Sequence, residues 1–390
     1  MIDKIERRLC TGCNSCVNSC PNSCIKMKVD EGGFWFPIID RKKCINCKLC
    51  ENACPIINNL APNIVRMPQT IAACCIDEIT REKSSSGGVF SVIAEYVLRC
   101  GGVVIGAAFS DDFKHVSHIC INSVDDLDKL RGSKYTQSFI GDVYRVTRKL
   151  LNDGKIVLFT GTPCQISGLF AYLGKSYNNL YTQDIICHGV SSPLVWEKYV
   201  DYRERMASSK TRAVHMRHKI SGWKNFSMYF LFENGKRYLK RKNKDPFLDA
   251  YLSNCCLRPS CYNCLFKSVQ RLADITLADF WGIQRVLPKM DDDRGTSLVL
   301  LHSSKGVELF NSIKEDLIYE EVDEESALRF NVAYDKCSES NASREAFLAE
   351  IDSVNFDVIV KRYTKISIRY RFNRLINRVG RKLNKIRNIQ

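Results

Sequence analysis

From residue 70 onward, apolar runs with strand-like spacing alternate with runs that have helical spacing. The clearest helical run is 89–99, where Val89, Ile93 and Val97 recur at intervals of four. Four apolar runs predict strands that are each followed by a loop and a helix: 70–76, 102–109, 156–160 and 180–187. This alternation predicts an α/β body with a largely buried sheet.

A second pattern follows the body. Residues 225–232 favour a strand that turns at Glu233-Asn234-Gly235-Lys236, which predicts an antiparallel hairpin inserted after the α/β body. Before the body, two prolines and no periodicity indicate a linker. The predicted domains are 1–60, a cysteine-rich domain; 61–69, the linker; 70–150 and 151–325, the two parts of the body; and 326–390, a helical C-terminal region.

The composition fits a globular chain of two or three domains. Of 390 residues, 45% are hydrophobic and 26% are charged, so the chain is neither disordered nor membrane-spanning. No apolar run approaches the roughly 18–20 residues of a spanning helix. The charged N-terminus has no apolar signal region, so we expect a cytoplasmic protein.

The 20 cysteines are the most informative feature. The spacing C-x2-C-x2-C-x3-C-P occurs twice, which is the spacing of bacterial ferredoxins with two 4Fe-4S clusters. Zinc sites use separated pairs rather than triplets with a trailing Cys-Pro, so zinc or disulfides are the weaker alternative. In the expected crossed pattern, Cys10, Cys13, Cys16 and Cys54 hold one cluster, and Cys44, Cys47, Cys50 and Cys20 hold the second.

Several cysteines stand outside this pattern. We expect them to be small buried side chains: Cys24, Cys74, Cys75, Cys100, Cys120 and Cys337. A further group comprises Cys255, Cys256, Cys261 and Cys264. It predicts either a zinc knot or, with Cys164 or Cys187, a third iron–sulfur cluster, and the sequence alone does not choose between them.

Three junctions between predicted strands and helices carry polar or reactive residues. Residues 84–88 combine serines and glycines before a helix, which suits either an ordinary N-cap or a phosphate site. The junctions at 160–165 and 184–193 place Cys164, Cys187 and His188 at strand ends. Open α/β sheets bind ligands there, although each cysteine is equally well explained as a buried apolar residue.

Six ordered motifs follow the ferredoxin-like segment and carry a family resemblance: 85–91, 132–138, 161–165, 187–189, 258–264 and 273–282. Together they resemble the coenzyme F420 hydrogenase/dehydrogenase beta subunit family, in the form fused to an N-terminal ferredoxin. The resemblance covers about residues 1–320, and Ala278, where the family usually has Gly, is a small departure. It implies a bacterial-type dicluster ferredoxin domain (α+β) fused to an α/β flavin-binding body, with a basic amphipathic C-terminal helix.

The resemblance also implies FAD in the body and a third 4Fe-4S cluster beside it. Residues expected to bind FAD are Ser85, Ser86, Gly87, Gly88, Lys134, Tyr135, Gln137, Thr162 and Pro163. For the third cluster it implies Cys256, Cys261 and Cys264, with Cys164 or Cys187 as the fourth ligand. Lys134 is expected to stabilise the reduced flavin and His188 to relay a proton, with a surface lysine and a structural histidine as the alternatives.

We therefore expect an iron–sulfur flavoprotein oxidoreductase, because a flavin converts between single electrons and electron pairs. Its expected partners are an electron donor such as ferredoxin and an unidentified small or carrier-linked substrate. Similar fused proteins suggest surface-polysaccharide metabolism. The alternative is a non-catalytic electron-relay subunit of a larger hydrogenase- or dehydrogenase-type complex, including one that reduces coenzyme F420.

The net charge of +15 is concentrated at the C-terminus. Residues 361–390 contain many Lys and Arg, no Asp or Glu, and apolar residues three or four apart. This pattern predicts a basic amphipathic helix that lies on the anionic inner membrane surface or, equally well, packs on the protein or a partner. The body shows no basic patch with interleaved aromatic residues, so we do not expect nucleic-acid binding.

Overall fold

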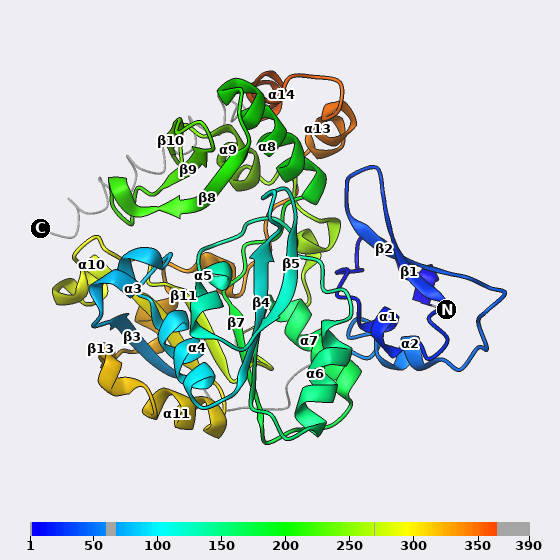
Figure 1. Ribbon diagram of the computed structural model, residues 1–390, viewed down its shortest axis with the longest axis horizontal. Helices are drawn as coiled ribbons and strands as arrows, with labels where there is room; N and C mark the ends of the chain where they lie inside the picture. The colour runs from blue at the N-terminus through cyan, green and yellow to red at the C-terminus, as the bar shows by residue number, and fades with distance from the viewer. Residues whose placement is uncertain (1, 60–67, 269, 365–390) are drawn as a thin grey trace, which may run out of the picture.

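The computed structural model describes residues 2–59, 68–268 and 270–364. It has a small N-terminal part, a central body on a large sheet, and a second sheet with its own helices (Figure 1). The predicted linker (61–69) and the predicted basic helix (361–390) lie outside the described residues, except for 68–69 and 361–364.

The central body is built on an eight-stranded mixed sheet with the order β13-β3-β12-β11-β7-β6-β4-β5. Strands β4, β6, β7 and β11 are parallel, and antiparallel strands extend the sheet at both edges. The sheet confirms the mixed α/β class that the alternating runs predict. The strands are β3 (Gln69–Cys75), β4 (Val103–Phe109), β5 (Val116–Ile121), β6 (Val157–Thr160), β7 (Leu180–Ile185), β11 (Ile275–Asp279), β12 (Ser297–Leu301) and β13 (Leu317–Glu321).

Helices cover both faces of this sheet (Figure 1). Because side chains alternate along a strand, Leu158 of β6 packs with α4, α5 and α11, whereas Phe159 packs with α6 and α7 on the other face. The helices of the body are α3 (Glu78–Lys83), α4 (Val89–Arg99), α5 (Leu127–Leu130), α6 (Val143–Asn152), α7 (Pro163–Leu173), α10 (Ile283–Val286), α11 (Ser304–Asn311) and α12 (Glu324–Leu328).

The second sheet contains the predicted hairpin and one more strand. Its order is β10-β9-β8, all antiparallel, with β8 (Thr211–His218), β9 (Ser227–Phe232) and β10 (Arg237–Arg241). An aromatic core that includes Trp196, Phe230 and Phe247 joins this sheet to its helices. These helices are α8 (Pro193–Ala207), α9 (Pro246–Leu252), α13 (Arg344–Glu350) and α14 (Phe356–Tyr363).

The N-terminal part is fixed to the body by buried hydrogen bonds. Arg258, which is 1% exposed, donates to the carbonyl oxygens of Cys10 (2.8 Å) and Trp35 (2.9 Å). Arg145 of α6 donates to the carbonyl oxygen of Asn18 at 2.8 Å. The elements of this part are α1 (Ser15–Ser19), β1 (Ile25–Val29), β2 (Trp35–Ile39) and α2 (Leu49–Asn52).

Short 3-10 helices connect the larger elements: η1 (Ile2–Lys4), η2 (Val124–Asp126), η3 (Lys219–Ser221), η4 (Pro259–Asn263), η5 (Pro288–Met290), η6 (Lys314–Asp316) and η7 (Val332–Tyr334). None of the helices in the described ranges is both long and apolar enough to cross a membrane.

The isolated cysteines divide into two classes. Cys24, Cys74 and Cys75 are buried, as predicted. The prediction was wrong for three others, which are exposed: Cys100, Cys120 and Cys337. Cys100 ends α4 at a surface turn, Cys120 lies on the edge strand β5, and Cys337 lies in a loop, so none of them reaches a core.

Candidate functional site

Eight cysteines of the N-terminal part line two cavities. The first is lined by Cys10, Cys13, Cys16 and Cys54, and the second by Cys20, Cys44, Cys47 and Cys50. The last cysteine of each run therefore lies with the triplet of the other run, which is the crossed arrangement that the spacing predicts. Cys24, which stands outside the motif, also lines the second cavity, and its sulfur lies 3.3 Å from that of Cys20.

The two cysteine loops share the same backbone turns. Gly12 and Asn46 occupy equivalent positions with φ of 68° and 55°, and Asn14 and Lys48 do so with φ of 62° and 61°. Left-handed residues between successive cysteines curve the backbone into a concave loop, the kind of surface that accommodates anionic iron–sulfur sites. The sequence repeat is therefore also a repeat in backbone conformation.

A third cysteine group is assembled from separate elements of the body. Cys164 lies in the first turn of α7, Cys187 follows β7, Cys261 lies in η4, and Cys264 ends that 3-10 helix. Burial raises the pKa of Cys164 well above its usual range, and the neighbouring Cys264, Cys187 and Cys261 raise it further. Burial also raises the pKa of Cys187 to about 12 and of Cys261 to about 11.

Cys256, which belongs to the expected ligand set, is not among the thiols that raise the pKa of Cys164. Cys255 and Cys256 are both fully buried in the aromatic core behind α9. The Cys255 thiol donates to the carbonyl oxygen of Tyr363 and accepts from Asn341. Packing of α9 turns both side chains into the core, whereas Cys164 and Cys187, which the sequence offered as alternatives, both lie in the third group.

The zinc alternative for these cysteines stays a prediction. No three His, Cys, Asp or Glu side chains in 2–59, 68–268 and 270–364 are arranged to hold a single metal ion. Cys337 adjoins the third group from outside, where its sulfur accepts from the backbone N–H of Cys264 at 3.2 Å.

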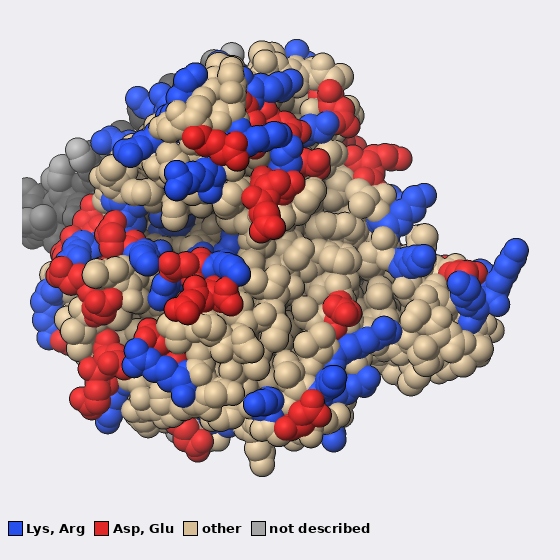
Figure 2. Space-filling view, in the orientation of Figure 1, with Lys and Arg blue, Asp and Glu red and all other residues tan. Residues whose placement is uncertain are grey.

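A cavity of about 560 Å³, called the main cavity below, adjoins the third group at Cys187. It lies at the carboxyl ends of β6, β7 and β11, where open α/β sheets bind ligands. Figure 2 shows a hollow between the two sheets, with Lys and Arg side chains in its depth. The predicted site residues that line it are Ser85, Ser86, Gly88, Lys134, Tyr135, Thr162, Cys187 and His188.

Three predicted FAD-binding residues do not line this cavity. The side chain of Gln137 donates to the carbonyl oxygen of Thr11 at 3.2 Å, so it belongs to the contact with the N-terminal part. Pro163 is buried as the first residue of α7. Gly87 packs against β3 and β12, where a Cβ atom would come within 2.5 Å of the Ala73 carbonyl oxygen.

The first and third cysteine groups adjoin at α7. A Cβ atom on Gly168 would lie 3.0 Å from the sulfur of Cys13 and 2.9 Å from the hydroxyl oxygen of Tyr144. Burial raises the pKa of Tyr144 well above its usual range, and both Cys13 and Cys164 contribute. The third group therefore adjoins the first group on one side and, through Cys187, the cavity on the other.

Three segments of the chain match known families. Residues 70–143 match the coenzyme F420 hydrogenase/dehydrogenase beta subunit N-term, and 154–327 match the C terminus of the same subunit. Residues 9–58 match the 4Fe-4S dicluster domain. The chain belongs to the coenzyme F420 hydrogenase/dehydrogenase beta subunit family. It is an iron–sulfur electron-transfer protein of that family, as the resemblance predicts.

Among solved structures, the chain is similar to one from the F420-reducing [NiFe] hydrogenase complex of Methanosarcina barkeri. The two are 17% identical with a TM-score of 0.45, and the match covers 75% of this chain and 90% of that chain. No curated protein matches the sequence.

Lys134 and His188 are both held by hydrogen bonds in this member of the beta subunit family. The Lys134 ammonium donates to the carbonyl oxygens of Leu130 (3.2 Å) and Arg131 (2.9 Å), and burial lowers its pKa to about 7. His188 pairs through Nε2 with Oδ1 of Asn254 at 2.8 Å, and burial lowers its pKa. Both groups line the cavity, and Lys134 is able to change protonation state near neutral pH.

Sequence reasoning missed His118, which lies on β5. Its Nε2 pairs with the carbonyl oxygen of Thr160 at 2.9 Å, so Nε2 carries the proton and Nδ1 is an acceptor. Burial lowers the pKa of His118 to about 4 and keeps the ring neutral. Nδ1 is buried without a hydrogen-bond partner, and so is Oε1 of Gln183, another cavity residue. No spacing signal distinguishes either residue in the sequence.

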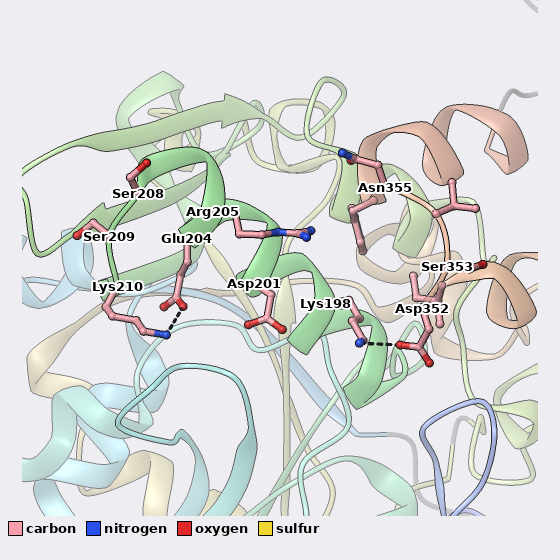
Figure 3. A pocket seen from close by; sticks show the side chains of 13 residues that line it. Lys198, Asp201, Glu204, Arg205, Ser208, Ser209, Lys210, Asp352, Ser353 and Asn355 are labelled. Carbon is pink, nitrogen blue, oxygen red and sulfur yellow. Dashed lines mark hydrogen bonds and ion pairs between the residues drawn. The ribbon is translucent and has the colours of Figure 1, made fainter.

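A further cavity, of about 670 Å³, lies between α8 and residues 351–356, away from the cysteines (Figure 3). Its charged side chains are mostly paired with each other. Lys198 pairs with Asp352 at 2.6 Å, and Lys210 pairs with Glu204 at 3.0 Å. Its lining contains no cysteine or histidine, so it offers nothing to redox chemistry.

Proposed function

We propose that the chain is an iron–sulfur flavoprotein oxidoreductase, which passes electrons from its ferredoxin-type clusters through FAD to a two-electron acceptor. The observation that carries the proposal is the third cysteine group (Cys164, Cys187, Cys261 and Cys264), which lies between the first group and the cavity. A chain that only stored electrons in its N-terminal part would need no such group beside a ligand cavity.

The three cysteine groups fit iron–sulfur clusters in their donor chemistry. Burial raises the pKa of Cys13 to about 12, so this thiol is neutral at pH 7 unless a cation stabilises the thiolate. Iron supplies that charge, and binding then releases the protons. When bound, the clusters accept and donate one electron at a time.

The main cavity fits a flavin in its polar lining. Nδ1 of His118 and Oε1 of Gln183 are buried acceptors without partners, and a ring that carries N–H groups would satisfy them. Ser85 and Ser86, which precede α4, would hold phosphate oxygens, with Gly88 leaving the backbone open. When bound, FAD exchanges single electrons with clusters and electron pairs with a substrate.

The chain's own residues would control protons in this cavity. Lys134, whose pKa is about 7, supplies positive charge to a reduced ring at neutral and lower pH. His118 stays neutral and accepts through Nδ1, whereas His188 is the side chain placed to exchange a proton beside Cys187. These roles of Lys134 and His188 are the ones expected from the sequence.

Electrons would enter at the second cysteine group. Cys47 is exposed, and Ile45 and Leu49 beside it are 64% and 45% exposed. Exposed lysines, including Lys42 and Lys48, surround them. An acidic one-electron carrier such as a ferredoxin would match this surface in charge and polarity. Surface-polysaccharide metabolism and F420 reduction stay predictions of the resemblance alone.

Anaerobic reconstitution tests the proposal. We expect about twelve irons per chain, from three cubanes, and one FAD. Reduced ferredoxin should then bleach the flavin, and an added two-electron acceptor should restore its colour with multiple turnovers. A chain that binds iron but no flavin would contradict the proposal. Flavin reduction without turnover of any acceptor would favour the electron-relay alternative.

A further inference from the structure

The floor of the main cavity contains a buried guanidinium with unused donors. Arg217, on β8, is 8% exposed and lines the cavity. Its Nη1 donates to Asp279 and the hydroxyl of Tyr135 adjoins the guanidinium, whereas Nε and Nη2 are buried and make no hydrogen bond of good geometry. The other oxygen of Asp279 accepts from Nε1 of Trp223 at 2.9 Å. A buried donor without an acceptor is unfavourable, so the missing acceptors should come from a ligand.

The surroundings of Arg217 select the charge of that ligand. Lys242 also lines the cavity, and Arg217 and Lys242 both lie over the ring of Phe226, at 4.5 Å and 5.0 Å. Burial lowers the pKa of Lys242, and the positive charge of Arg217 lowers it further. Two cations face one carboxylate, Asp279, so this wall has an excess positive charge in a partly desolvated place.

We propose that Arg217, assisted by Lys242, binds an anionic oxygen group, a phosphate or a carboxylate, of a ligand in the main cavity. Two parallel N–H donors of one guanidinium match two oxygens of such a group. The ring of Trp281, 5.6 Å from the Arg217 guanidinium, provides an adjoining flat surface. The ligand's identity rests on the proposed function: the anion belongs either to the diphosphate of FAD or to the two-electron acceptor.

The experiment uses the full chain, reconstituted anaerobically with iron, and measures binding of three probes: FAD, riboflavin and inorganic pyrophosphate. Arg217→Lys keeps the charge beside Asp279 but removes the paired donors, and Arg217→Gln removes the charge. Arg212→Gln is the matched control, because Arg212 lies on the same strand with an exposed side chain. Circular dichroism and iron content establish that each variant is folded.

We expect wild type and Arg212→Gln to bind alike. If the anion belongs to FAD, both Arg217 variants bind FAD about 10- to 100-fold more weakly than the wild type does, whereas their affinity for riboflavin is unchanged. If it belongs to the acceptor, the Arg217 variants bind FAD and riboflavin as the wild type does. Pyrophosphate then binds the FAD-loaded variants about 10-fold or more weakly than it binds the FAD-loaded wild type. Equal binding of all three probes by folded Arg217 variants would overturn the proposal. A wild-type chain that binds no flavin but binds pyrophosphate through Arg217 would remove the proposed function and leave the anion subsite.

Discussion

Gly168 of α7 lies directly against Cys13 of the N-terminal part, and a single added carbon atom on Gly168 would stand 3.0 Å from the Cys13 sulfur. Cys164 of the third group lies one turn earlier on the same helix. The contact therefore sets how closely the first and third cysteine groups approach. Glycine is required here by space, since a helix interior otherwise favours alanine.

Replacing Gly168 should separate the two groups. For Gly168→Ala we expect a destabilisation of about 1–3 kcal/mol from overpacking against Cys13 and Tyr144. Flavin reduction after the ferredoxin-type clusters are reduced should be slower, as stopped-flow absorbance will show. Gly174→Ala at the end of the same helix is the control, because no atom lies near its Cβ position and only its positive φ of 68° is strained. An unchanged rate in Gly168→Ala would show that this contact does not limit transfer.

The ligand set of the third cluster is open to a direct count of iron. Cys264→Ser and Cys187→Ser should each lower the iron content from about twelve to about eight per chain. Cys256→Ala should keep about twelve, because Cys256 lies in the aromatic core. If Cys256→Ala loses the cluster and Cys187→Ser does not, the grouping of thiols in the structure is not the functional one.

Lys134 should give the chain a distinctive dependence of stability on pH. Burial lowers its pKa to about 7, so between this pH and the ordinary lysine range the unfolded chain binds more protons than the folded chain. The stability contributed by this group is therefore lowest below pH 7 and rises as the pH increases above 7. In Lys134→Met this component is absent.

The measurement is the thermal midpoint of wild type and Lys134→Met at pH 6.5 and pH 9. The difference, wild type minus variant, should increase toward pH 9. Lys129→Met is the control, because Lys129 is an exposed residue whose pKa is raised through its pair with Asp126. Parallel pH profiles for wild type and Lys134→Met would contradict a lowered pKa at Lys134.

The exposed surface around Cys47 predicts salt-dependent electron entry. The double variant Lys42→Glu and Lys48→Glu should slow reduction by an acidic ferredoxin about 10-fold or more at low salt, because it reverses the charge that steers encounter. Reduction by dithionite, a small reagent, should change little. Lys149→Glu with Lys175→Glu, both exposed on the body, is the matched control. Equal ferredoxin rates in all variants would place donor docking elsewhere.

Much of the fold could be predicted because its signals are local. The helix at 89–99 and the hairpin with its turn at 233–236 follow from apolar spacing and turn residues, and the structure confirms both. Strands β12 and β13 were not predicted, because their pairing with β3 joins segments more than 200 residues apart. The predicted roles of Ser85, Ser86 and Thr162 stay predictions, although these residues line the cavity.

The sequence by itself determined the two ferredoxin-type loops, because two or three residues between cysteines fix how far apart the thiols stand within one turn of chain. Only the tertiary structure decided the third group. Cys164, Cys187 and Cys261 are far apart in the chain, and the packing of α9, rather than spacing, directs Cys256 into the core. The same holds for Gly168, His118 and Arg217, whose importance comes from contacts and unused hydrogen-bonding atoms that exist only after distant strands and helices have come together.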